Sequence, residues 1–129
     1  MKISIHNERR VIDVQQEFNT IFPFLNLEFF DLCQDALSSY TIPGDRYPNV
    51  LVGDLRDSGH NGELTIYPGM TIMQLEHQLY DEFGLKAQVF MRTGSNWTRT
   101  SLNGYWLLFH KNEEGRRSCQ ALDNAQESV

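Results

Sequence analysis

The residues best suited to binding chemistry lie in a basic and aromatic stretch of the second half of the chain. Arg92, Trp97 and Arg99 surround the sequence Thr-Gly-Ser-Asn, which predicts a β-hairpin with a four-residue loop at positions 93–96. Arginines beside an indole ring suit recognition of a carboxylate, a phosphate or an acidic patch of a partner. The same set would suit stacking on single-stranded nucleic acid. The alternative is structural, with Trp97 in the core and the arginines paired with acidic residues elsewhere.

A second candidate surface is the apolar run at positions 105–109. Its sequence, Tyr-Trp-Leu-Leu-Phe, is too short to classify by its period. The run is either the last core element or a patch that another subunit buries. Tyr105, Trp106 and Phe109 are the interface candidates, because aromatic side chains often anchor protein interfaces. A homodimer with two-fold symmetry is the default form of such a contact.

The sequence marks no catalytic residue, metal or cofactor. It contains no nucleophile elbow, phosphate-binding loop or glycine-rich dinucleotide turn. An enzyme that uses an unmarked pair of carboxylates stays an alternative. Asp54, Asp57 and His60 are spaced like metal ligands, but a solvated acidic turn explains them equally well. Cys33 and Cys119 are isolated, which predicts two unpaired thiols.

The charge is unevenly distributed along the chain. The 129 residues carry a formal net charge of −6. Residues 1–85 contribute −8, whereas residues 86–117 contribute +4. The overall sign argues against a general binder of nucleic acid or anionic membranes. The sequence has neither an apolar run long enough to span a bilayer nor a signal-peptide pattern at its start, so we expect a cytoplasmic protein without a membrane partner.

Two stretches of the chain, 2–30 and 63–90, share one pattern. Each opens with alternating apolar residues, which predict a short strand. Each continues with apolar residues at the spacing of one helical face. In the first stretch these are Val11, Val14, Phe18 and Phe22, and in the second they are Ile72, Leu75, Leu79 and Phe83. Alternation then returns, so we predict strand–helix–strand twice, from a repeat or from two generic patterns of the same kind.

Local signals mark the ends of the two predicted helices. Thr71 followed by Gln74 fits a capping box, in which each side chain meets a backbone donor at the start of the second helix. Gly84 fits the glycine that ends this helix. Pro23 ends the first helix, because proline lacks an N–H donor and restricts the residue before it.

These elements predict an α+β domain over residues 1–112. We expect the duplicated βαβ units to form one mixed sheet with helices packed on it, as in a ferredoxin-like or related sandwich, followed by the C-terminal hairpin. Residues 113–129 are polar, and we expect a frayed tail there.

The second half of the chain resembles a group of small bacterial proteins of unknown function. The likeness rests on Phe-Gly-Leu-Lys-Ala-Gln-Val-Phe at positions 83–90, which is similar to a strand of that group, and on Gly-Ser-Asn-Trp at positions 94–97, which is similar to its hairpin turn. The resemblance implies a shared fold family and carries no activity.

Three functional hypotheses follow. The first is a non-catalytic interaction or structural module that self-associates. The second is a binding protein or an enzyme that takes a small molecule or anion through Arg92, Trp97 and Arg99. The third is a single-strand nucleic-acid binder that uses the same residues.

Overall fold

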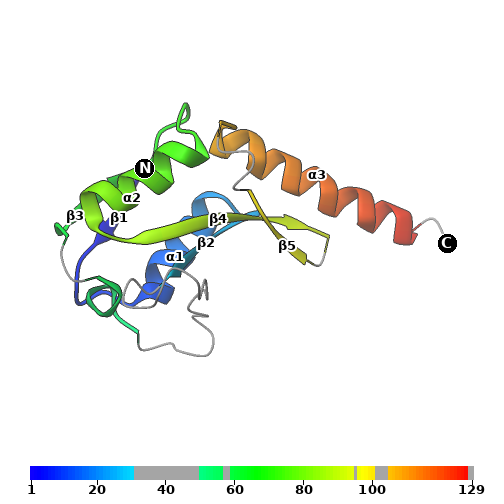
Figure 1. Ribbon diagram of the computed structural model, residues 1–129. Coiled ribbons are helices and arrows are strands. Elements are labelled where there is room, and N and C mark those ends of the chain that lie inside the picture. Colours follow the sequence, from blue (N-terminus) through cyan, green and yellow to red (C-terminus); the bar gives the residue numbers. More distant parts are fainter. Residues whose placement is uncertain (31–49, 57–58, 95, 101–104, 128–129) are drawn as a thin grey trace.

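The computed structural model describes residues 1–30, 50–56, 59–94, 96–100 and 105–127. Their elements follow the order strand–helix–strand twice, with a 3₁₀ helix between the two units and a strand and a helix after them (Figure 1). In chain order they are β1 (Lys2–Ile5), α1 (Val11–Ile21), β2 (Leu25–Phe30), η1 (Val52–Leu55), β3 (Gly62–Thr65), α2 (Ile72–Phe83), β4 (Lys86–Thr93), β5 (Asn96–Arg99) and α3 (Leu108–Glu127). The α+β class, with helices packed on the strands, is confirmed.

Both similar stretches form the predicted strand–helix–strand unit. The capping box at the start of α2 is present, since the Thr71 hydroxyl accepts a hydrogen bond from the Gln74 N–H at 3.1 Å and the Gln74 side chain accepts one from the Thr71 N–H at 2.9 Å. Gly84 ends the helix with a φ of 65°, in the left-handed region that favours glycine. α1 ends at Ile21, two residues before Pro23.

The strands of the described residues form two antiparallel sheets, whereas we expected one mixed sheet. β1 pairs with β3, and the second sheet has the order β2-β4-β5. The first strands of the two units therefore pair with each other, as do the second strands. On the edge of β2 that faces away from β4, side chains of α1 rather than another strand bind the backbone carbonyls. The element order of the two units is consistent with a ferredoxin-like arrangement.

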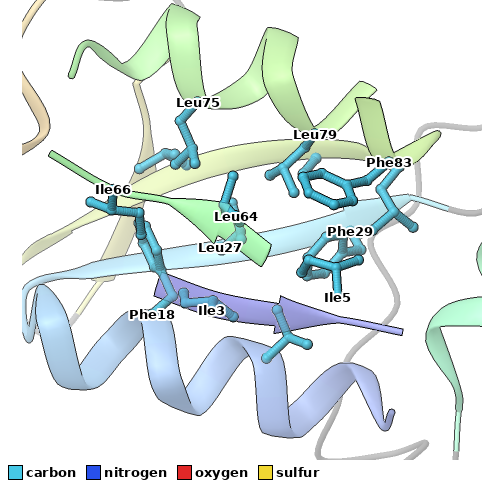
Figure 2. Packing of buried hydrophobic residues seen from close by; sticks show 14 of the residues in the cluster. Ile3, Ile5, Phe18, Leu27, Phe29, Leu64, Ile66, Leu75, Leu79 and Phe83 are labelled. Carbon is cyan, nitrogen blue, oxygen red and sulfur yellow. The ribbon is translucent and has the colours of Figure 1, made fainter. Parts of the chain in front are cut away.

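The hydrophobic core lies between the two sheets and the helices of the two units. Figure 2 shows side chains from β1, β2 and β3 pointing into the same interior as those from α1 and α2. The labelled members are Ile3, Ile5, Phe18, Leu27, Phe29, Leu64, Ile66, Leu75, Leu79 and Phe83, all of them buried. The apolar helical faces predicted from the sequence are thus the faces that pack.

Polar side chains of α1 and α2 bind the outer edge of β2 and the part of β4 that extends past its pairing with β5. The Gln15 amide donates to the Leu27 carbonyl at 2.9 Å, and the Asn19 amide donates to the Leu25 carbonyl at 3.0 Å. On α2, the Glu76 carboxylate accepts from the Val89 N–H at 3.2 Å. Gln15 and Glu76 occupy equivalent positions of the two units, so both helices satisfy backbone groups that the sheet itself leaves unpaired.

A buried arginine ties the end of the 3₁₀ helix to three other segments. Arg56 follows η1 and is almost fully buried. Its guanidinium donates five hydrogen bonds of 2.6–3.1 Å to neutral oxygens, namely Asn7 Oδ1 twice, Asn61 Oδ1, His60 O and Phe83 O. Burial lowers the pKa of this guanidinium. Gly59 is required beside it, because a Cβ there would lie 2.4 Å from the Phe83 carbonyl oxygen.

Residues expected to form a frayed tail are helical as far as Glu127. α3 starts beside the start of α2 and runs past the β4–β5 hairpin (Figure 1). Leu108 is buried at its start, and Asn112 accepts a hydrogen bond from the Phe24 N–H at 2.8 Å. At Gly115 the helix comes so close to the sheet that a Cβ would lie 3.2 Å from the Arg92 carbonyl oxygen. These contacts hold a helix whose composition is polar.

Candidate functional site

The predicted hairpin is formed by β4 and β5, with a shorter loop than expected. Thr93 pairs with Asn96, so two residues rather than four lie in the loop, and Gly94 has a φ of 62°. Arg92 pairs with Trp97, which places their side chains next to each other on one face of the sheet. Arg99 pairs with Phe90, and its side chain lies outside the described part of the structure.

Trp97 is not a core residue. Its side chain is 44% exposed, which contradicts the structural alternative for this tryptophan. Arg92 is exposed as well, and its Nε donates to the Gly94 carbonyl at 3.1 Å. The neighbouring Met91 is buried on the opposite face, where α3 crosses the sheet at Gly115. Arg92 and Trp97 therefore lie on the face that α3 does not cover.

The apolar run at positions 105–109 divides between the core and the surface. Leu108 is buried and its N–H donates to the Met70 carbonyl at 3.0 Å. Tyr105, Trp106 and Phe109 all expose half or more of their side chains. The run thus contributes one residue to the core and exposes three aromatic side chains near the start of α3.

An open hollow of about 660 Å³ adjoins two of these aromatic residues. It is lined by Trp106, Phe109, His110, Glu113, Glu114 and Arg117, and we call it the α3 hollow. The Phe109 and His110 rings lie 6.3 Å apart between centroids. The hollow therefore combines two aromatic side chains with an imidazole, two carboxylates and a guanidinium, a mixture of apolar and charged groups that suits a binding surface.

A buried lysine supports one wall of the α3 hollow. Lys111 is only 5% exposed, and its ammonium group lies 5.1 Å from the centre of the Trp106 ring. The same group donates to Glu114 at 2.8 Å. A cation between an aromatic face and a carboxylate holds both in place. Sequence reasoning missed this residue, because a lysine in a polar segment carries no sign of burial.

The two carboxylates of the α3 hollow are already paired within the helix. Arg116 binds Glu113 through Nε and Nη2, with its shortest contact at 2.7 Å, and this hydrogen bonding lowers the pKa of the Glu113 carboxyl. Glu114 is paired with Lys111. Arg117 has no hydrogen bond or ion pair with the described residues, so its positive charge is available to a partner.

The remaining candidates do not gather into a site in the described part of the chain. Asp54 accepts from the Leu51 N–H at 3.0 Å and so caps η1, while Asp57 lies outside the described residues. Among the described residues, no three or more His, Cys, Asp or Glu side chains are placed to hold a metal ion. Cys119 is a free thiol near the Gly94 carbonyl, and Cys33 lies outside the described residues.

Comparisons with known proteins identify no family for this chain. No family model matches the chain, and neither a curated protein nor a solved structure matches it. None of the helices in the described ranges is both long and apolar enough to cross a membrane.

Proposed function

We propose that this chain is a non-catalytic interaction module that self-associates through the α3 hollow. The observation that carries the proposal is the group of exposed aromatic side chains beside that hollow. Phe109 is 56% exposed on an otherwise polar helix, and Trp106 presents half of its surface next to it. Aromatic side chains contribute much of the binding energy of protein interfaces when a partner removes them from water.

The charges of the α3 hollow favour a second copy of the chain as the occupant. The aromatic residues lie at the N-terminal end of the hollow, the carboxylates in its middle, and the unpaired Arg117 at its C-terminal end. Two α3 helices packed antiparallel about a two-fold axis near Glu113 would bring Arg117 of each copy to Phe109 and Trp106 of the other. An arginine over an aromatic ring beside carboxylates is a favourable contact, and the symmetry would form it twice.

The test compares two charge substitutions at aromatic residues of equal exposure. Phe109→Glu places an anion in the proposed interface, whereas Tyr80→Glu changes a 58% exposed tyrosine on α2, outside the α3 hollow. We expect the dimer dissociation constant to rise by about 30-fold or more in Phe109→Glu, as expected when an interface anchor is lost, and to stay unchanged in Tyr80→Glu. Sedimentation equilibrium gives both constants, and thermal melts confirm that each variant folds.

A mass of 15.0 kDa at every concentration of the wild-type protein would overturn the proposal. So would equal weakening by the two substitutions, because the dimer would then not use the α3 hollow. Arg117→Gln adds an independent check, since it removes only the cation that the second copy would receive and should also raise the dimer dissociation constant.

A further inference from the structure

The outer edge of β5 carries backbone groups that point away from the sheet. The Thr100 N–H donates to the Val89 carbonyl at 3.2 Å, and the Arg92 N–H donates to the Phe24 carbonyl, on the β2 side, at 2.9 Å. Hydrogen-bonded and non-hydrogen-bonded pairs alternate along an antiparallel ladder. Arg92 and Trp97 are therefore a non-hydrogen-bonded pair, so the N–H and C=O of Trp97 face outward. No other described residue contacts them by a hydrogen bond.

This edge differs from the other outer edge of its own sheet and from the outer edge of β1. Gln15 and Asn19 bind the outer edge of β2, and the Arg9 side chain binds the Ser4 carbonyl of β1 at 2.8 Å. Glu76 binds β4 at Val89, where this strand extends past its pairing with β5. An open strand edge promotes pairing with another chain, and proteins usually close such edges. β5 ends the sheet of order β2-β4-β5, and no side chain of the described residues binds its outer edge. The outer edge of β3 has no bound side chain among these residues either, but β3 carries Glu63 and no basic residue.

The side chains beside this edge indicate the charge of a partner. Arg92 and Trp97 lie next to each other on the face of the sheet that α3 leaves uncovered. Residues 86–100 contain three basic residues and no acidic one, within a chain of net charge −6. A segment with acidic side chains on the Trp97 face would be attracted to this hairpin and repelled by most of the remaining surface.

From these observations we propose that β5 binds an extended acidic segment of a partner protein as an additional strand. The backbone of the segment would pair with the outward N–H and C=O groups of β5, and its carboxylates would meet the Arg92 guanidinium beside the Trp97 ring. A peptide backbone matches the alternating donors and acceptors of a strand edge. The phosphates of a nucleic acid, or a small anion, supply only acceptors to them, and the net charge of the chain opposes a polyanion.

The probe is a fluorophore-labelled peptide, Thr-Glu-Val-Glu-Val-Glu-Thr, followed by fluorescence anisotropy. Trp97→Val removes the indole ring but keeps the outward N–H, whereas Trp97→Pro removes both and leaves the ladder to β4 intact. We expect binding about fivefold weaker in Trp97→Val and about tenfold weaker again in Trp97→Pro, because the second change deletes a backbone donor and blocks the edge. The Arg92→Glu variant should bind this peptide less tightly than a peptide in which lysine replaces glutamate.

A change in the peptide tests the same point on the unaltered protein. Methylating alternate backbone nitrogens blocks one edge of the peptide and leaves its side chains in place, so we expect the two possible methylation frames to differ by about tenfold or more in affinity. Three outcomes would each overturn the proposal. The first is equal binding of the two methylation frames, and the second is equal affinity of Trp97→Val and Trp97→Pro for the acidic peptide. The third is tighter binding of a thymidine oligonucleotide than of the acidic peptide.

Discussion

The second strands of the two similar units, β2 and β4, differ from the last strand of the hairpin, β5, in how their backbone groups are bound. In each unit, the helix returns alongside the strand that follows it and places a polar side chain on the backbone of that strand. β5 is followed by no such helix, because α3 crosses the sheet on the Met91 face at Gly115. The bound backbone groups of β2 and β4 lie in the part that holds the core, whereas the open edge of β5 lies in the part that exposes Trp97 and Trp106.

This difference separates the stabilising part of the molecule from the part available for binding. The paired units contain nearly all of the core, and their polar groups are largely satisfied internally. The hairpin and α3 add few residues to that core and present Trp97, Trp106 and Phe109 to solvent. Substitutions in the first part should therefore change the free energy of unfolding, and substitutions in the second should change association.

The largest loss of stability is expected from Arg56→Ala. The variant would leave Asn7 Oδ1 and two backbone carbonyls without their donor and would remove one of the two donors to Asn61 Oδ1, with an expected cost of about 3 kcal/mol in the free energy of unfolding. Urea denaturation measures this cost. Arg10→Ala is the matched control, because Arg10 is exposed and pairs only locally with Asp13, so its loss should cost less than about 1 kcal/mol. Similar costs for both arginines would mean that the buried cluster adds no stability.

Gln15→Glu should cause the next largest loss of stability, because it removes the amide group that donates a hydrogen bond to the edge of β2. A carboxylate cannot donate to the Leu27 carbonyl, and it would lie near the Glu28 carboxylate, which is 3.4 Å from the Gln15 amide. We expect a loss of about 2 kcal/mol at pH 7, measured by urea denaturation. Gln16→Glu, at the exposed neighbouring position, makes the same chemical change and should cost less than about 0.5 kcal/mol. If Gln15→Glu costs as little free energy of unfolding as Gln16→Glu, the hydrogen bond from Gln15 to the edge of β2 does not stabilise the fold.

Much of the architecture is predictable from the sequence because it depends on local patterns. Alternating residues identify the strands, the 3–4 spacing identifies the faces of α1 and α2, and the capping box at Thr71 fixes where α2 begins. The partners of the strands are not encoded in this way. Alternation shows which face of a strand is buried but not which strand lies beside it, so the division into two antiparallel sheets was not predicted.

The binding surfaces were predictable only in part. The hairpin brings Arg92 next to Trp97 because the turn residues set the register. The docking of α3 could not be foreseen, since it depends on Leu108, Asn112 and Gly115, which form no periodic apolar face. The burial of Lys111 could not be predicted either, because it depends on the position of the Trp106 ring.

The smallest and most specific effect is expected from Glu76→Gln. Burial raises the pKa of the Glu76 carboxyl, and the hydrogen bond from Val89 opposes that rise only in part. The folded state therefore disfavours the carboxylate at pH 7, whereas the unfolded chain does not. As the pH falls through the raised pKa towards the ordinary value of 4.5, the folded protein takes up a proton first and this group's contribution to stability increases.

Glutamine is neutral at every pH and keeps an oxygen that can accept from the Val89 N–H. We therefore expect Glu76→Gln to be slightly more stable than the wild-type protein at pH 7, with the difference shrinking towards pH 4.5, in urea denaturation at a series of pH values. A variant that is less stable at pH 7 would show that Val89 needs a charged acceptor. In that case position 76 would need a charged acceptor for the Val89 N–H, whereas the equivalent position 15 needs a neutral donor to the Leu27 carbonyl.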